Sequence, residues 1–159
     1  MTIVEAKPRT IVAPKLRVPK KNPAQITSIQ DLARPGIKLV IGDPSVPVGS
    51  YTRTVFRNLN LNAALNNVVS NENDVKAVAG KVALGEADAG IVYQTDINPV
   101  KKLVTAIQIP ASAQPVAAYE IAVVSNAPHP AQAQAFVSYV TSKAGQAWLK
   151  KFGFILPSS

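Results

Sequence analysis

The chain has 159 residues, of which 47% are apolar and 16% are charged, a balance typical of one globular domain with a sizeable core. No apolar run approaches the roughly 20 residues of a membrane span, so membrane insertion is not expected. Cysteine is absent, which excludes thiolate metal sites, thiol nucleophiles and disulfides. With His129 as the single histidine, a zinc site or a histidine-based catalytic triad has almost no material.

A formal net charge of +8 favours anionic partners such as nucleic acid, a membrane surface or a small anion. The first part of the chain holds a cluster of basic residues, which predicts a solvated basic arm. A nucleic-acid-binding module is the alternative, although the arm lacks the interleaved aromatic residues that such modules usually have. The cluster consists of Lys7, Arg9, Lys15, Arg17, Lys20 and Lys21.

Hydrophobic periodicity predicts strands that alternate with helices. Residues 11–18 favour an extended segment that Pro14 would confine to an edge or a connector. Ser28 and Asp31 fit a capping box and predict a short helix ending near Ala33. A strand over 37–41, a loop rich in proline and glycine, and a helix beginning near Ser50 follow.

The second half continues this pattern. Asn71 and Asp74 form a capping pair before a helix that ends at Gly85, and Ser142 is the expected N-cap of the last helix. Alternating strands and helices predict an α/β fold with a mostly parallel open sheet flanked by helices. The remaining predicted elements are strands over 67–69, 87–93, 103–109 and 118–124, and helices over 131–140 and 142–152.

Residues with catalytic chemistry are few. Glu86 and Asp88 lie at a turn, where acidic side chains usually face solvent. The loop over 42–49 has two glycines but not the lysine and hydroxyl residue of a phosphate-binding P-loop. We expect no enzymatic activity, no catalytic residues, no metal site and no cofactor.

Geometry instead favours an anion site. In an open α/β sheet, ligands bind beyond the carboxyl ends of the strands, where helix N-termini present unpaired N–H groups. Two predicted helix starts, near 48–50 and 73–75, follow strands of the same sheet, and the strand ending in Tyr93 brings a phenol to the same edge. The alternative is that these are ordinary loops and that Tyr93 is a half-buried residue at the core edge.

Four segments resemble molybdate-binding proteins, the solute receptors of ABC importers. GDPSVPVGSY at 42–51 is similar to the family's GDP-x-VPAG-x-Y segment. ENDV at 72–75 and GEADAGIVYQTD at 85–96 are similar to two further family segments, and the residues from Tyr119 to Phe154 resemble the family's ending. The resemblance extends over roughly residues 4–156.

The resemblance implies a two-lobed receptor of the type II periplasmic-binding-protein class that holds a tetrahedral oxyanion, molybdate or tungstate, between its lobes. The implied donors are the main-chain N–H groups of Val48 and Val75 and the hydroxyl of Tyr93. Val48 stands where the family usually has alanine, so its size is expected to affect the pocket. Four neighbours are weaker candidates: Pro47, Gly49, Ser50 and Asp74. The implied partner is an ABC permease, and the implied location is the periplasm.

The family pattern also implies that the first lobe and its serine contacts have no counterpart in this chain. The expected organisation is a basic segment and interlobe crossing over 1–24, an α/β lobe over 25–124 and a helical tail over 125–159 that packs on the absent lobe. We therefore expect weak oxyanion binding by the chain alone and self-association through the tail. Because no signal peptide is visible near Met1, a cytoplasmic anion-sensing or regulatory module is a further alternative.

Overall fold

The computed structural model describes residues 7–115, 117–154 and 156, and the chain divides into two compact units. The sheet unit is continuous, Ala13–Pro115, and the terminal unit combines the residues before it with those after it. The boundaries differ from the predicted lobe over 25–124. Strand β2 (Pro14–Pro19) belongs to the main sheet, whereas β7 (Ala117–Ile121) pairs with β1 (Lys7–Val12) outside it.

The sheet unit contains a five-stranded sheet in the order β4-β3-β5-β2-β6. β3 is parallel to both β4 and β5, whereas β2 is antiparallel to β5 and β6, so β2 alone runs against the other strands of this sheet. The predicted α/β class is confirmed, with one reversed strand in the sheet. The strands not yet delimited are β3 (Leu39–Gly42), β4 (Val68–Glu72), β5 (Ala89–Tyr93) and β6 (Val104–Ile107).

The interior position of β2 shows that the edge or connector predicted from Pro14 was wrong. Pro14 lies opposite Tyr93 of β5, before the pairing with β6 begins at Leu16. Pro19 lies opposite Val104 of β6, beyond the last pair with β5. Proline lacks the N–H that would donate to a neighbouring strand. This loss disrupts the sheet least at the two ends of β2, where each proline pairs with one neighbouring strand, so the hydrogen bonds at the centre of β2 are kept.

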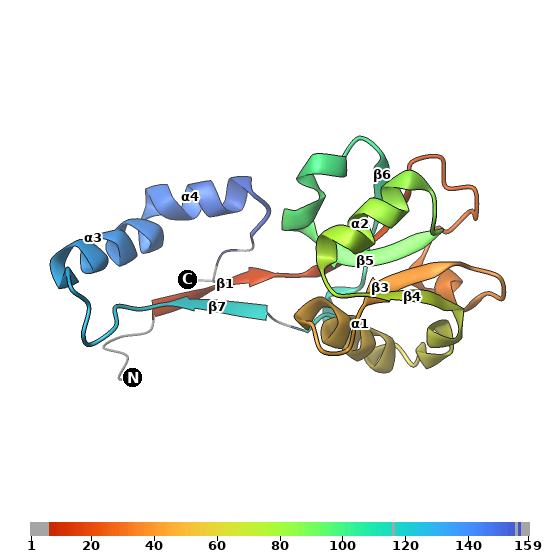
Figure 1. Cartoon of the computed structure of the whole chain (residues 1–159), viewed down its shortest axis with the longest axis horizontal. Coiled ribbons are helices and arrows are strands. Elements are labelled where there is room, and N and C mark those ends of the chain that lie inside the picture. The colour runs from red at the N-terminus through yellow and green to blue at the C-terminus, as the bar shows by residue number, and fades with distance from the viewer. Residues whose placement is uncertain (1–6, 116, 155, 157–159) are drawn as a thin grey trace. The chain divides into compact units, whose positions relative to one another are not determined.

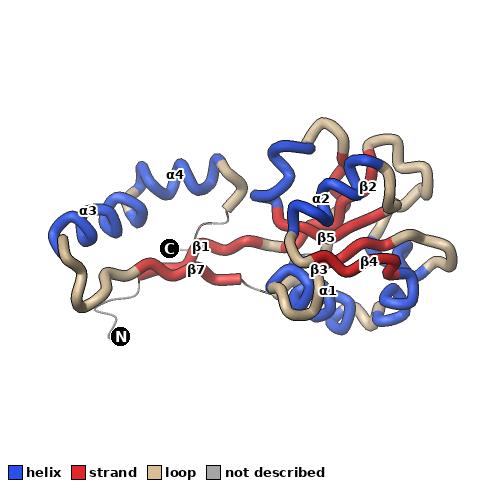
Figure 2. Tube along the Cα trace, in the orientation of Figure 1, coloured by secondary structure: helices blue, strands red, loops and turns tan. Residues whose placement is uncertain are grey.

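Two helices cover opposite faces of this sheet, α1 (Pro47–Asn58) and α2 (Val75–Leu84), and Figure 2 shows the strands lying between them. A hydrophobic core lies on each face of the sheet. Successive side chains of a strand point to opposite faces, so each strand contributes alternately to the two cores. Thus Leu39 and Ile41 of β3 pack on the α1 side together with Phe56, whereas Val40 packs on the α2 side. The sheet unit is therefore a three-layer α/β/α arrangement.

Four short 3-10 helices connect these elements: η1 (Ile29–Ala33), η2 (Asn62–Asn67), η3 (Gln94–Val100) and η4 (Ala111–Ala113). The predicted capping box before η1 is confirmed. One carboxylate oxygen of Asp31 accepts from the N–H groups of Thr27 and Ser28 at 2.8 and 2.9 Å. These two backbone hydrogen bonds lower the pKa of Asp31 to about 2.

The terminal unit joins the antiparallel ribbon of β1 and β7 to two helices, α3 (Pro130–Thr141) and α4 (Lys143–Lys151), drawn in blue in Figure 1. The predicted cap of α4 is confirmed, because the Ser142 hydroxyl accepts from the Gly145 N–H at 3.2 Å. These helices leave large apolar side chains open to solvent. Phe136, Tyr139, Trp148 and Phe152 are each more than half exposed.

The basic cluster is only partly a solvated arm. Arg17 is 3% exposed, and its Nη2 donates to Oε1 of Gln94. Burial lowers the pKa of Arg17. Lys15 donates to Oε1 of Gln108 at 3.3 Å. The predicted solvated arm is wrong for Arg17, since this side chain lies within the sheet unit.

None of the helices in the described part of the chain has the length and apolar character needed to cross a membrane.

Candidate anion-binding site

The carboxyl ends of β3, β4 and β5 lie side by side at one edge of the sheet, because these three strands are adjacent and parallel. β3 leads into α1 and β4 leads into α2 (Figure 1), so both helices begin at this edge. Helix N-termini carry unpaired N–H groups and a partial positive charge. The structure thus places the two predicted helix starts and the end of β5 at a common edge.

Helix α1 begins at Pro47, three residues earlier than predicted from Ser50, and its N-cap is Val46, whose side chain makes no cap hydrogen bond. Proline at the first position of a helix was the signal that could have located this start. Pro47 has no N–H to donate, and the N–H groups of Gly49 and Ser50 donate to the Val46 carbonyl at 3.0 and 3.1 Å. Val48 therefore carries the first N–H of α1, in the turn where no intrahelical carbonyl is available.

The Val48 side chain points into the protein. It is 3% exposed, and its Cγ1 lies 2.6 Å from the position that a Cβ on Gly42 would take. Its bulk, expected to affect the pocket, is thus accommodated over a glycine. Gly49 is equally constrained, because a Cβ there would lie 1.9 Å from the Asp43 carbonyl oxygen. The two glycines allow α1 to approach the end of β3 closely.

Arg53 holds this loop together. Its Nη1 donates to the main-chain carbonyls of Gly42 and Gly49, at 3.0 Å each, and its Nη2 donates to Oδ1 of Asn71 at 2.8 Å. One guanidinium thereby joins the end of β3, the first turn of α1 and the end of β4. The sequence analysis missed this residue, and nothing in its local pattern distinguishes it from a surface arginine.

Helix α2 begins at Val75, and its N-cap is Asp74, whose Oδ1 accepts from the Ala77 N–H at 2.9 Å. The predicted pairing of Asn71 with Asp74 was wrong, since the Asn71 oxygen is bound to Arg53. Asp74 acts as an acceptor, so it presents no donor to an anion. The Val75 N–H lies in the first turn of α2, where no intrahelical carbonyl is available.

Tyr93 ends β5 and is 9% exposed. In the parallel register Gly90 lies opposite Val40, which brings Tyr93 level with Asp43 at the same edge. Its ring meets the ring of Tyr51 from α1 edge-on, with centroids 6.5 Å apart. This ring contact is direct evidence that α1 and the end of β5 are neighbours.

Acidic side chains around this edge are already hydrogen-bonded. Asp43 accepts from the hydroxyl and the N–H of Ser45, and these bonds lower its pKa. Glu72 of β4 accepts from Lys81 at 2.6 Å and from Ser70, which lowers the pKa of Glu72. The ammonium of Lys81 lies 2.6 Å from the Glu72 carboxylate and compensates its charge.

Other residues considered from the sequence lie elsewhere. The Asp88 carboxylate accepts from the Lys38 N–H at 2.8 Å and so supports a strand end. His129 is the exposed N-cap of α3, in the terminal unit. Among the residues that the structure describes, no group of three or more His, Cys, Asp or Glu is placed to hold a metal ion. The edge offers neutral donors, which suit an anion.

The model of the family described as bacterial extracellular solute-binding protein matches residues 4–155. A molybdate-binding protein, ModA, from Mycobacterium tuberculosis is 42% identical over 136 residues, 86% of this chain and 51% of that protein. A putative ABC transporter substrate-binding lipoprotein, YvgL, from Bacillus subtilis is 31% identical over 140 residues, 87% of this chain and 54% of that protein. The chain belongs to the bacterial extracellular solute-binding protein family, and it spans about half the length of these curated relatives.

Solved structures support the same fold. The substrate-binding domain of a putative molybdenum ABC transporter from Clostridium difficile aligns with a TM-score of 0.84 at 24% identity, covering 98% of this chain and 69% of that chain. The periplasmic molybdate-binding protein of Azotobacter vinelandii aligns with a TM-score of 0.71 at 23% identity, covering 92% of this chain and 67% of that chain. The predicted resemblance is thereby confirmed in sequence and in fold.

Proposed function

We propose that this chain contributes part of the oxyanion site of a solute-binding protein that serves an ABC importer of molybdate or tungstate. The observation that carries the proposal is the edge where β3, β4 and β5 end. There the first N–H groups of α1 and α2, on Val48 and Val75, lie beyond neighbouring strands, and Tyr93 ends the third strand. Similarity to molybdate-binding proteins supports molybdate as the solute.

Neutral donors suit a fully ionised oxyanion. A dianion can accept hydrogen bonds at every oxygen, whereas a protonated oxyanion carries an O–H that needs an acceptor. Val48 and Val75 donate through the main chain, where the position of the N–H is fixed by the helix. Asp74 and Asp43 accept hydrogen bonds from Ala77 and Ser45, which hold one oxygen of each carboxylate within its own loop.

We expect the chain by itself to bind an oxyanion weakly. Three donors satisfy only part of the accepting capacity of a tetrahedral anion, and each hydrogen bond to a charged group is worth roughly 1.5–3 kcal/mol. Calorimetric titration of the chain with molybdate, tungstate and sulfate tests this. A Kd weaker than about 1 µM is expected. A Kd of 1 µM requires about 8 kcal/mol, which is near the upper limit for three such bonds before the entropic cost of association is subtracted.

The decisive variant is Tyr93→Phe, which removes the hydroxyl and keeps the ring. It should weaken molybdate binding about tenfold, the effect of one hydrogen bond of about 1.4 kcal/mol. Tyr139→Phe in α3 is the matched control and should change nothing. Equal binding by the wild type and the Tyr93→Phe variant would remove Tyr93 from the site. Sub-micromolar binding by a monomer would contradict the expectation of an incomplete site.

We further propose that the protein acts in the periplasm with an ABC permease, needs no cofactor beyond its oxyanion ligand and has no enzymatic activity. The family supports this, because its members are extracellular solute-binding proteins. The buried position of Arg17 counts against the alternative of a basic nucleic-acid-binding arm.

A further inference from the structure

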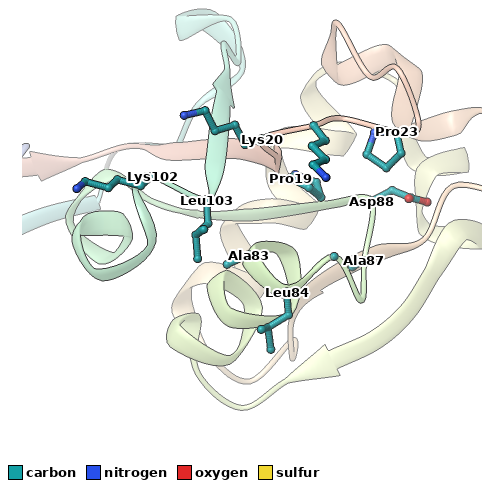
Figure 3. Close-up of a pocket in the computed structure, with 11 residues that line it drawn as sticks. Pro19, Lys20, Pro23, Ala83, Leu84, Ala87, Asp88, Lys102 and Leu103 are labelled. Carbon is teal, nitrogen blue, oxygen red and sulfur yellow. The ribbon is translucent and has the colours of Figure 1, made fainter.

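A concave site lies at the opposite end of the sheet unit from the edge where β3, β4 and β5 end (the anion edge). It is a cavity of about 410 Å³ between the end of β2, the C-terminus of α2 and the start of β6, and Figure 3 shows its walls. Volumes of this order are typical of sites for small organic ligands. Tyr93 pairs with Pro14 at one end of β2, whereas the cavity is lined by Pro19 at the other end.

The cavity combines apolar walls with a cationic rim. Pro19, Ala83 and the half-exposed Leu103 contribute apolar surface, and Leu84 of α2 is 74% exposed beside them. Three exposed lysines, Lys20, Lys21 and Lys102, also line the site. In Figure 3 the Leu103 side chain points toward α2, whereas the Lys20 and Lys102 side chains extend to the left of the view, away from Leu84.

The backbone around the cavity is held in place. The Lys20 N–H donates to the Leu103 carbonyl at 2.8 Å, which joins the end of β2 to the turn before β6. On the other side the Asp88 N–H donates to the Lys38 carbonyl, and the Asp88 carboxylate accepts from the Lys38 N–H, both at 2.8 Å. The one acidic residue of the lining is thus already hydrogen-bonded, while the lysine side chains are free to reach a ligand.

We propose that this cavity binds an amphipathic monocarboxylate, such as a medium-chain fatty acid anion. Its carboxylate binds at the rim, where the exposed side chains of Lys20, Lys21 and Lys102 can rotate toward it, and its apolar body covers Leu84 and Leu103. A small anion without an apolar body should bind less well here, because it has no apolar area to bury against these walls.

The direction of α2 selects against a compact tetrahedral dianion here. This end of α2 carries the negative end of the helix dipole, with Gly85 in the left-handed conformation at φ 75°. A dianion needs N–H groups of the kind found at the other end of the same helix. A monocarboxylate can keep its charge at the lysine rim and lay its chain over the carbon atoms of Leu84.

The test is calorimetric titration of the full chain with sodium octanoate, with acetate and octylammonium as probes that lack the apolar chain or reverse the charge. We expect saturable binding of octanoate alone. Combining Lys20→Gln with Lys102→Gln should weaken octanoate binding at least about tenfold, because two ammonium groups are lost. Leu103→Asn should also weaken octanoate binding, because it removes apolar contact with the chain of the ligand. The matched control combines Lys143→Gln with Lys150→Gln in α4, which changes the net charge equally and should leave the affinity within about twofold.

Amide NMR spectra locate the bound probe, which matters because the exposed aromatic residues of the terminal unit offer another apolar surface. Octanoate should shift the signals of Lys20, Gly85 and Leu103 and leave that of Trp148 unchanged. The proposal would be overturned if octanoate did not bind, if acetate bound equally well, or if the shifts were confined to the terminal unit. It would also be overturned if both double lysine variants lost the same amount of octanoate affinity. Saturating molybdate should not displace octanoate, since the two sites lie at opposite ends of the sheet.

Discussion

The rings of Tyr51 and Tyr93 meet edge-on at an interplanar angle of 70°, which ties the first half of α1 to the end of β5. Edge-to-face pairs of this kind contribute about 1 kcal/mol beyond the burial of the rings. Tyr51→Ala should therefore destabilise the protein by at least that amount and weaken oxyanion binding, because Tyr93 loses its neighbour. Tyr51→Phe keeps the ring and should behave like the wild type. Urea denaturation and molybdate titration of both variants check this, and identical behaviour of the two variants would contradict it.

Arg53 should contribute more to folding stability and to oxyanion binding than is usual for a partly exposed arginine. Arg53→Lys places one compact ammonium where a planar guanidinium contacts two carbonyls and an amide, so it cannot satisfy all three. We expect a loss of about 1–3 kcal/mol of folding free energy and weaker oxyanion binding. Arg57→Met is the control: this exposed arginine of the same helix donates to the Thr54 hydroxyl at 3.0 Å, and its loss should cost less than about 0.5 kcal/mol. Equal effects at both positions would show that Arg53 does not hold the loop.

Two glycines should respond in opposite ways to alanine. In Gly49→Ala the new Cβ would lie 1.9 Å from the Asp43 carbonyl oxygen and 2.4 Å from that of Gly42, so the loop must move. We expect a destabilisation of about 3 kcal/mol or more. Around Gly80, within α2, a Cβ meets nothing within 4 Å. Gly80→Ala should stabilise the helix by about 0.5–1 kcal/mol. Thermal unfolding measures both, and a tolerated Gly49→Ala would show that the approach of α1 to β3 can relax.

Stability should fall at low pH partly through Asp31. The pKa of Asp31 in the folded protein, about 2, lies below the ordinary value of 3.8 for an aspartate. Its contribution to the free energy of unfolding is therefore fully present above pH 3.8 and is lost as the pH falls toward 2. The difference in unfolding free energy between the wild type and Asp31→Asn should therefore narrow between about pH 4 and pH 2. Asp96→Asn, in a different short helix, serves for comparison. A difference that stays constant over this window would contradict the role given to the Thr27 and Ser28 N–H groups.

The aromatic face of the terminal unit should make the chain associate at high concentration. Phe136, Tyr139 and Trp148 lie on α3 and α4 and line an apolar cavity of about 330 Å³ together with neighbouring side chains. Apolar patches of this kind usually mark contact surfaces. Light scattering should give a mass that rises with concentration, and Phe136→Ser with Trp148→Ser should suppress the rise. A monomer at every concentration would exclude self-association through this face.

Local chemistry accounts for the parts of the fold that the sequence predicted well. The capping box at Ser28, the left-handed Gly85 and the Ser142 cap each depend on residues a few positions apart, and all three are present. The apolar run that ends at Tyr93 also forms the predicted buried strand.

Long-range contacts account for most of what the sequence did not predict. An interior strand can begin at Pro14 only because β5 and β6 pair with different residues of β2. Arg53 donates to main-chain carbonyls, which every residue has, so no sequence pattern marks its partners. The buried Arg17 likewise depends on Gln94, far away in the sequence. For the anion edge, the sequence indicated the right loops, but the register that brings Tyr93 beside α1 required the structure.

The pairing of β1 with β7 has a consequence for how the chain folds. Thr10 lies opposite Tyr119, so the ribbon joins segments more than a hundred residues apart. The entropy lost on closing such a loop is large for an unfolded chain and much smaller once the intervening residues are compact. Because Ala13–Pro115 forms a continuous unit with its own core, it can fold first and bring the two strands of the ribbon together. The sheet unit is in this sense an inserted domain, and the ribbon is expected to be the late, slow step of folding.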